Sequence, residues 1–313
     1  MRTAFLEALG RAAARDARVC LVVGDLGYSV IDEFARSYPT QFVNAGVAEQ
    51  NMTGLAAGMA LSGKVVFTYS IANFSTLRCL EQIRNDVCYH QANVRVVAVG
   101  GGVAYGNLGA SHHATEDLAI LRSLPGMLVV APGDPVEAAL ATEALITYQG
   151  PAYLRLGKAG EPVVHASQPD FQLGRAITMR DGEDVTLVST GGMLATACEV
   201  ADGLAERGIK ARVLSMHTVK PLDVDAVTAA AVQTRHLFTL EEHSLTGGLG
   251  SAVAEVLAEF EGPHAPLRRL AFPAEFNHEV GDQAHLRKRH GLDADGLLRT
   301  ILATVERSTP LVR

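Results

Sequence analysis

Glu49 is the residue of this sequence whose surroundings most clearly raise a chemical question. It is the single carboxylate in FVNAGVAEQNMTGLAAGMALSGKVVF (42–67), a segment otherwise rich in Gly, Ala and Val. A glutamate in the first turn of a helix commonly complements the helix dipole. A glutamate aimed at a bound ligand would instead need close-packed, dry surroundings such as these. The residues alone leave both interpretations open.

The Gly-rich segment VGGGVAYGNLGASHHATED (99–117) is a second candidate site, because it ends in His112 and His113. Its glycines match the dinucleotide pattern G-x-G-x-x-G only by choice of register, and the loop before the next predicted helix is too long for that motif. A turn is the ordinary interpretation of such a segment. A polar site at the carboxyl end of a strand is the functional one.

Phe74 is a third candidate, in YSIANFSTLRCLEQIRNDV (69–87), just past a predicted strand. Most aromatic residues in such places belong to the core. The sequence contains no G-x-S-x-G elbow, H-E-x-x-H pair or P-loop. These residues therefore predict a site near 46–49, 70–74 and 106–113 without naming a reaction.

The elements that must position these residues alternate between short β-branched runs and helical patterns, which is typical of parallel sheets covered by helices. We predict strands at 19–23, 65–69, 94–99, 127–131, 152–156, 185–190, 210–215 and 236–241. Helices are predicted at 48–61, 74–90, 115–123, 134–148, 193–207, 249–260 and 293–307. Asp134 followed by Pro135 is a helix start signal.

The expected fold class is α/β, with two domains that each contain a mostly parallel sheet covered by helices. We place the first domain at 1–165, a linker at 166–184 and the second domain at 185–313. The linker prediction rests on the Gly, Pro and turn residues of 157–184, which lack helical periodicity.

Composition restricts the class of protein. The 313 residues suffice for two domains, and 48% apolar with 19% charged residues is typical of a globular chain. A net charge of −7 argues against nucleic-acid binding, and no apolar stretch is long enough for a membrane span. The four cysteines lack metal-ligand spacing, so we expect reduced thiols in a cytoplasmic protein.

Several blocks in the same order resemble the transketolase family of thiamine-diphosphate enzymes, in its pyrimidine-binding and C-terminal domains. The main block is GVAEQNMTGLAAGMALSGKVVF, which is similar to that family's glutamate segment. The supporting blocks are EQIRNDV, GASHHATEDLAILRSLPGMLVVAPGDPVEA, GPAYLRLGK and EEHSLTGGLGSAV. The resemblance covers nearly the whole chain.

The resemblance implies a cofactor role for three residues. In this family the glutamate that corresponds to Glu49 hydrogen-bonds N1′ of the aminopyrimidine and so favours formation of the thiamine-diphosphate ylide. A carboxylate in apolar surroundings holds a proton more tightly and can share it with a ring nitrogen. Phe74 resembles the aromatic residue that stacks on the aminopyrimidine. Asp25, in VVGDLGYS, resembles the acidic residue near the cofactor.

The resemblance also implies substrate contacts. His112 resembles the histidine that contacts the reacting oxygens of the donor sugar, which makes it a catalytic residue together with Glu49. Arg155 resembles the arginine that clamps the substrate phosphate, a role that suits a planar guanidinium. Ser29 and Arg2 correspond to further phosphate contacts.

Four positions depart from the family's pattern. Ile71 replaces the first stacking aromatic residue, and Gly100 replaces a histidine that often helps to bind phosphate. Leu108 replaces the aspartate that contacts a donor hydroxyl, and His113 stands where glutamine is common. We therefore expect a sugar or ketose substrate that differs from those of the pentose phosphate pathway.

The N-terminal domain of full-length relatives, which binds the diphosphate through Mg²⁺, has no counterpart here, since GDLGYS is not its G-D-G motif. We therefore expect the C-terminal subunit of a split transketolase that transfers a two-carbon ketol unit. Its partner would be an N-terminal subunit carrying Mg²⁺, and the assembly an α₂β₂ heterotetramer.

Three other interpretations stay open. The chain could be the β subunit of a 2-oxo acid dehydrogenase or a 1-deoxyxylulose-5-phosphate synthase-like enzyme, which share this architecture. It could also be a non-catalytic scaffold subunit, although an intact Glu49 argues against that.

Overall fold

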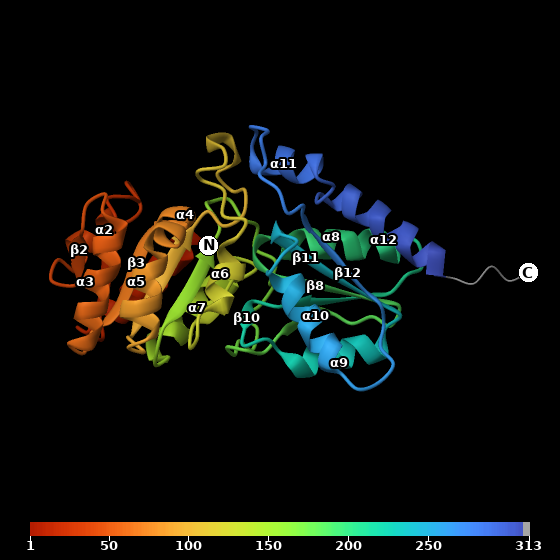
Figure 1. Cartoon of the computed structure of the whole chain (residues 1–313), viewed down its shortest axis with the longest axis horizontal. Coiled ribbons are helices and arrows are strands. Elements are labelled where there is room, and N and C mark those ends of the chain that lie inside the picture. Colours follow the sequence, from red (N-terminus) through yellow and green to blue (C-terminus); the bar gives the residue numbers. More distant parts are fainter. Residues whose placement is uncertain (309–313) are drawn as a thin grey trace, which may run out of the picture.

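The computed structural model describes residues 1–308 and contains two α/β domains that lie side by side along the long axis of the molecule (Figure 1). Helices cover both faces of each sheet. The predicted fold class, two domains with mostly parallel sheets, is confirmed. No helix within residues 1–308 is both long and apolar enough to span a bilayer.

In the described residues, the first sheet has seven strands in the order β10-β5-β6-β4-β3-β1-β2, and every neighbouring pair is parallel except β10 with β5. Their bounds are β1 Val19–Val23, β2 Phe42–Asn44, β3 Val65–Ile71, β4 Val94–Val99, β5 Leu128–Val130, β6 Ala152–Leu156 and β10 Thr218–Lys220. The strands β1, β4, β5 and β6 are buried throughout, as expected for a parallel sheet covered on both faces.

Two layers of helices cover this first sheet. The core on one face includes residues of α3 (Glu49–Leu61) and α6 (Asp117–Ser123). The core on the other face includes residues of α1 (Arg2–Ala13) and α7 (Pro135–Thr147), and a short α2 (Asp32–Ser37) lies after β1. Asp134 caps α7 by accepting a hydrogen bond from the Glu137 amide at 2.8 Å, which confirms the predicted start signal.

The second sheet has five strands within the part of the chain that the structure describes, in the order β12-β11-β8-β9-β7. The strands are β7 Ile177–Arg180, β8 Val185–Ser189, β9 Ala211–Ser215, β11 His236–Ser244 and β12 Leu267–Phe272. The helices are α8 Leu194–Ala205, α9 Val224–Gln233, α10 Leu249–Glu259, α11 Gln283–Arg289 and α12 Ala294–Ser308.

Two short strands lie in places that the sequence did not indicate. The range 166–184, expected to be a linker, contains β7, which pairs antiparallel with β9 in the second sheet. The strand β10 follows β9 in the sequence but pairs with β5 at the edge of the first sheet. Strands this short carry too few residues to show an alternating pattern.

The helix predicted at 74–90 is divided into several short pieces. They are α4 Ala72–Ser75, the 3₁₀ turn η1 Leu77–Cys79, α5 Leu80–Gln82 and the π-helical η2 Ile83–Cys88. The hydroxyls of Ser75 and Thr76 donate to carbonyl oxygens of Ile71 and Ala72, which competes with regular helix bonding. The first break therefore falls after Ser75, at Thr76.

Candidate active site

Glu49 begins α3 and is almost completely buried, with 1% of its surface exposed. Its Oε2 accepts a hydrogen bond from Arg78 Nη1 at 2.8 Å. The side chain of Arg78 is 45% exposed, so solvent surrounds part of this partner. A buried carboxylate with a single, partly solvated counterion is a poor structural element, because charged groups need full pairing when they leave water.

The surroundings of Glu49 include a polar atom that lacks a partner. A Cβ at Gly24 would lie 3.3 Å from Glu49 Cγ and 3.6 Å from Ser70 Oγ, so both side chains border this glycine. Among residues 1–308, the buried Ser70 hydroxyl makes no hydrogen bond. Buried hydroxyls normally have a partner, which indicates that this region is built to receive a polar group.

Arg78 links Glu49 to Phe74. Its guanidinium carbon lies 4.5 Å from the centre of the Phe74 ring, a cation–π contact between residues four positions apart. The sequence patterns did not single out Arg78. The spacing of four between an aromatic and a basic residue was the available signal.

His112 completes this row of side chains. Its ring lies edge-on to Phe74 with centroids 5.1 Å apart, and Ser111 Oγ lies 3.0 Å from His112 Nδ1. Partial burial, with a smaller effect from His113, lowers the pKa of His112 below its ordinary value. The imidazole is therefore mostly neutral at neutral pH, so it can both donate and accept hydrogen bonds.

Asp25 lies at the carboxyl end of β1, where its Oδ1 accepts a hydrogen bond from Asn44 Nδ2 at 2.9 Å. Its backbone has a φ of 54°, a left-handed conformation that short polar residues tolerate. Ile71 ends β3 and is half-buried. The carboxyl ends of β1, β2 and β3 therefore gather the expected cofactor residues at one edge of the sheet.

Arg2 lies beside two tyrosines at the start of α1. Its positive charge opposes the rise that burial causes in the pKa of Tyr69 and of Tyr105. Arg2 Nε is buried without a hydrogen-bond partner in the described part of the chain. Ser29 is exposed, and its amide donates to Asp32 Oδ2 at 3.1 Å. The structure thus places an incompletely paired cation near Tyr105, whose ring centroid lies 6.3 Å from that of His112.

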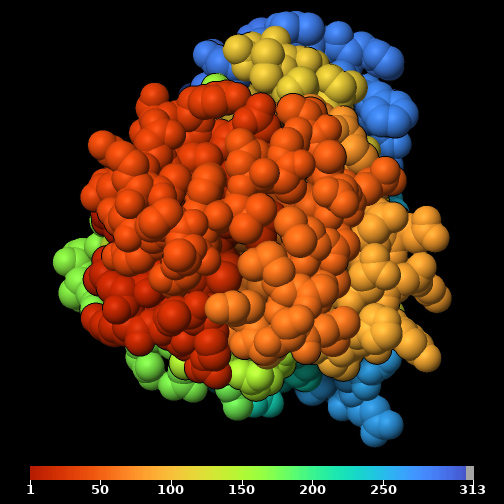
Figure 2. All heavy atoms as spheres, turned by 90° about the vertical axis from the view of Figure 1, so that its left-hand side faces the viewer, coloured from red at the N-terminus to blue at the C-terminus, as the bar shows by residue number. Residues whose placement is uncertain are grey.

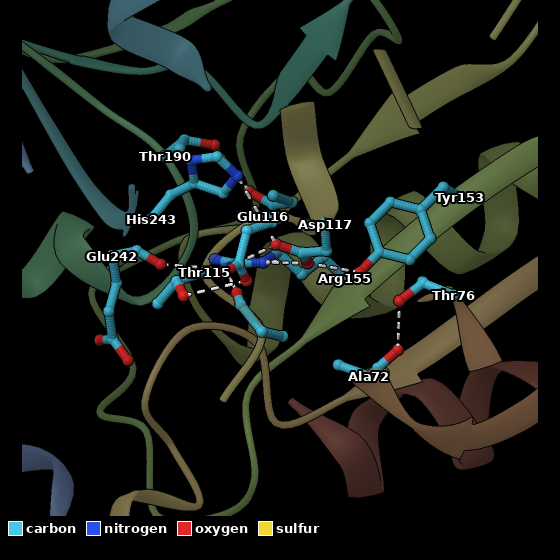
Figure 3. Close-up of polar contacts among 12 residues, drawn as sticks. Ala72, Thr76, Thr115, Glu116, Asp117, Tyr153, Arg155, Thr190, Glu242 and His243 are labelled. Atoms are coloured by element: carbon cyan, nitrogen blue, oxygen red, sulfur yellow. Dashed lines mark hydrogen bonds and ion pairs between the residues drawn. The ribbon is translucent and has the colours of Figure 1, made fainter. Parts of the chain in front are cut away.

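Arg155 lies in a buried cluster between the domains (Figure 3). Its Nε donates to Asp117 Oδ2 at 2.7 Å, and Tyr153 Oη donates to the same oxygen at 2.5 Å. Burial would raise the pKa of Asp117, but the charge and hydrogen bonds of Arg155 outweigh it, so the pKa lies below its ordinary value. The role of Arg155 as a phosphate clamp stays a prediction. Its other side borders a cavity of about 140 Å³ that Arg287 and Gly191 also line.

Three of the four positions that depart from the family pattern, Gly100, Leu108 and His113, lie on or beside the loop that carries His112. Leu108 ends the 3₁₀ turn η3 (Gly106–Leu108) with half of its surface exposed. His113 is buried, and its Nε2 lies 3.3 Å from the carbonyl oxygen of Gly106. A Cβ at Gly100 would lie 2.1 Å from the ring of Tyr105, so the tyrosine fills the space beside that glycine.

This arrangement can hold and orient a planar, polar heterocycle. It combines a buried carboxylate, an aromatic face at Phe74 and a neutral imidazole at His112 within one row. A carboxylate in such a place can share a proton with a ring nitrogen, and the imidazole can exchange hydrogen bonds with substrate oxygens.

Comparisons with known proteins identify the family of both domains. Residues 1–160 match the family model "Transketolase, pyrimidine binding domain", and residues 174–297 match "Transketolase, C-terminal domain". Together the two matches cover both domains of the structure.

Similar proteins include transketolase subunits from bacteria. The chain is 41% identical over 308 residues to a subunit of the apulose-4-phosphate transketolase of Phocaeicola vulgatus, covering 98% of this chain and 97% of that protein. It is 37% identical over 308 residues to a 6-deoxy-6-sulfo-D-fructose transketolase subunit of a Clostridium species, covering 98% and 95%. A solved structure, "Split gene transketolase, inactive beta4 tetramer", superposes with a TM-score of 0.88 at 36% identity, covering 100% of this chain and 98% of that one.

Proposed function

The chain belongs to the transketolase family, and we propose that it is the C-terminal subunit of a split transketolase. In this proposal it transfers a two-carbon ketol unit from a ketose or ketose phosphate donor to an aldehyde acceptor. The observation that carries the proposal is Glu49, a carboxylate buried beside the unpartnered Ser70 hydroxyl and in line with Phe74 and His112.

The residues present fit the pyrimidine half of thiamine diphosphate. Glu49 would share a proton with the aminopyrimidine ring, Phe74 would lie against its face, and Asp25 and Ile71 would border it. When bound, the cofactor supplies the carbon nucleophile that the reaction needs. The orphan hydroxyl of Ser70 supports a polar ring at this place, since a buried hydroxyl without a partner costs free energy.

The protein's own side chains would divide the remaining work. Glu49 would hold a proton at the ring nitrogen, and Arg78 would balance its charge until the site is filled. His112, kept neutral by its lowered pKa, would exchange hydrogen bonds with the oxygens of the donor sugar. Arg2, with its unpartnered Nε, and Arg155 are the candidates for an anionic group of the substrate, and Ser29 is a further one.

We propose that the diphosphate and Mg²⁺ are bound by a separate N-terminal subunit. The related structure at 36% identity is described as an inactive β₄ tetramer of a split-gene enzyme, which supports the expectation that a chain of this kind is inactive by itself. Within residues 1–308, no three His, Cys, Asp or Glu side chains are grouped to hold a metal ion.

The face around α2 and α3 is the expected contact surface for an α₂β₂ assembly. The first part of the chain, coloured red to orange, forms most of the face in Figure 2. Large apolar residues are exposed in this part, including Tyr28 at 72% and Val47 at 73%. A Cβ at Gly54 or Gly58 would contact nothing within 4 Å, so α3 can receive a close neighbour there.

The substrate is expected to differ from the common ketose phosphates. Leu108 offers no hydrogen bond to a donor hydroxyl, and Gly100 offers no cation to a phosphate. The similar subunits are named for apulose 4-phosphate and for 6-deoxy-6-sulfo-D-fructose, which supports an unusual sugar as substrate. We also expect the complex to work in the cytoplasm.

Reconstitution tests the proposal. The purified chain alone should bind thiamine diphosphate weakly and show no turnover. Mixed with a neighbouring-gene product that carries the G-D-G motif, it should transfer ketol units in the presence of Mg²⁺. Parallel assays with pyruvate plus an aldehyde, and with pyruvate plus an acceptor dye, would detect the synthase-like and dehydrogenase alternatives. Robust activity of the single chain would contradict the split-subunit proposal.

A further inference from the structure

Each of the three successive glycines 100–102 leaves a space that a different side chain occupies. A Cβ at Gly100 would lie 2.1 Å from the Tyr105 ring, and one at Gly101 would lie 2.6 Å from Arg155 Nε. A Cβ at Gly102 would lie 2.5 Å from Glu242 Oε1, and its φ is +64°. Side chains therefore pack directly against all three glycines, and two of these side chains, Arg155 and Glu242, come from outside the loop.

Glu242 comes from β11 of the C-terminal domain and is 3% exposed. Its Oε1 accepts a hydrogen bond from the Val103 amide at 2.7 Å and another from Gln283 Nε2 at 2.9 Å. Its Oε2 accepts from Arg287 Nε at 2.5 Å. One carboxylate thus joins the first residue after the glycines to helix α11 of the other domain.

The loop is held at its base by its own backbone and by Arg155 of β6, and at its turn by α11 of the C-terminal domain. Gly102 and Ala114 pair through both backbone bonds, at 3.0 and 2.7 Å, which closes the loop around 103–113. Arg155 Nη2 donates to the Ala114 carbonyl at 2.8 Å and to the Glu242 carbonyl at 3.0 Å, as Figure 3 shows for Arg155 and Glu242. At the turn, a Cβ at Gly106 would lie 2.7 Å from Leu286 Cδ1 of α11.

His112 lies near the end of this closed loop, with its ring against Phe74. Successive backbone hydrogen bonds run through the loop, from the Gly106 amide to Val103, from Gly109 to Gly106 and from His112 to Gly109. A group that fixes Val103 therefore also affects the position of the histidine. Glu242 bonds both the loop and α11, and its carboxylate therefore ties the loop to the C-terminal domain.

We propose that Glu242 is a positioning residue, through which the C-terminal domain sets the place of His112. The inference rests on the proposed function, because it assigns His112 to contact with the donor sugar. It gives the C-terminal domain a part in substrate recognition, although the row of Glu49, Phe74 and His112 lies wholly in the first domain.

The test compares Glu242→Gln with Glu241→Gln in the complete two-subunit complex. Glu241 is the neighbouring residue, is fully buried, and accepts from the amides of Leu249 and Gly250 at the start of α10. These bonds lie within the C-terminal domain, away from the loop. Both variants replace a buried carboxylate in β11 by an amide of the same shape, and Glu242→Gln also removes an ion pair with Arg287 of α11, which is part of the tie under test.

Glu242→Gln should lower kcat/KM for the ketose donor roughly tenfold to hundredfold, the scale of a misplaced catalytic group. The concentration of thiamine diphosphate that half-saturates the complex should stay unchanged, since Glu49 and Phe74 are untouched. Glu241→Gln should leave both quantities near their wild-type values. Equal donor kinetics in the two variants would overturn the proposal.

Hydrogen exchange supplies a readout that needs no activity. In the purified chain, Glu242→Gln should speed exchange of the Val103 amide and of peptides within 103–113, and Glu241→Gln should not. A wild-type complex without ketol transfer would contradict the proposed function and leave this exchange result standing. Unchanged exchange in Glu242→Gln would contradict the positioning role alone.

A pair of glycine variants guards against misfolding of the glutamate variants. Gly102→Ala and Gly208→Ala both place a side chain at positive φ, +64° and +73°, but of the two only Gly102 has neighbours within 4 Å, and Gly208 lies in the turn after α8, outside the loop. Gly102→Ala should reproduce the loss in donor kcat/KM, and Gly208→Ala should show only the cost of a side chain at positive φ. Equal losses in both would also count against the proposal.

Discussion

Glu49 and Asp117 are buried to the same extent, each with 1% of its surface exposed, but their partners differ. Asp117 is surrounded by Tyr153 and Arg155, both buried themselves. The counterion of Glu49 is Arg78, whose side chain is 45% exposed and belongs to a broken helix. The freedom of the partner, more than the burial of the acid, therefore separates a carboxylate that holds a fold from one that awaits a ligand.

The largest effect is expected for Asp117, whose partners Tyr153 and Arg155 are both buried. Asp117→Asn leaves the Arg155 guanidinium buried without its counterion, which should lower the free energy of unfolding by about 3–5 kcal/mol. Urea denaturation of the purified chain measures this. Asp202→Asn, which breaks the exposed pair with Arg180, is the control and should cost less than about 1 kcal/mol. Equal losses would remove the distinction between the two kinds of acid.

Replacement of Glu49, whose counterion is partly exposed, should lower the activity of the complex and leave its stability unchanged. Glu49→Gln keeps the volume of the side chain but cannot share a proton in the required sense. The complex should lose at least roughly a hundredfold in kcat, the scale of a missing acid–base group. Its urea midpoint should stay close to that of the wild type. A variant that retains most activity would show that Glu49, like Asp117, is structural.

A smaller effect is expected at Leu108, on the loop that carries His112. A donor hydroxyl buried against this side chain without a partner costs about 1–3 kcal/mol. Leu108→Asp should therefore raise kcat/KM for xylulose 5-phosphate. If the wild-type complex already uses that sugar at roughly 10⁴ M⁻¹s⁻¹ or better, the expectation of an unusual substrate is wrong.

A change of pH is the mildest perturbation, and it should distinguish the active-site residue His112 from the structural residue Asp117 without a mutation. The pKa of His112 is lowered from 6.5, so kcat/KM for the donor should fall as the pH drops through a value below 6.5. The pKa of Asp117 is lowered from 3.8, so its contribution to stability is complete above about pH 3.8 and is lost as the pH falls through its folded value. As the pH falls, activity should therefore be lost before the Asp117–Arg155 ion pair. Reaction rates and denaturation measured over the same pH range would show this order.

Local patterns predicted much of the fold and part of the site. Periodicity located α3 and most of the longer strands, but it missed the strand β12 and the helix α9. The Asp134 cap was readable from two adjacent residues. The small residues around Glu49 singled it out in the sequence, and the family resemblance supplied its role. Figure 3 shows a cluster that local patterns could not predict, because Asp117 and Arg155 are 38 positions apart in sequence.

The contacts that the sequence did not predict join residues that are far apart in the chain. Arg78 is 29 positions from Glu49, and Glu242 is 139 positions from Val103. No local pattern connects such pairs, since their proximity follows from the order of strands in the two sheets. The strands β2 and β10 escaped notice for another reason, because three residues each cannot establish a period.

The strand β10 also bears on how this chain loses its structure. It leaves the second domain to complete the edge of the first sheet beside β5, and the chain then returns to form α9 and β11. Neither domain can melt without exposing backbone groups of the other, so heating should give a single calorimetric transition in place of two. A cut between the domains, within 166–184, would likewise yield no autonomous halves. When the C-terminal domain is exchanged between relatives, residues 218–220 should stay matched to the first domain, whose sheet they complete.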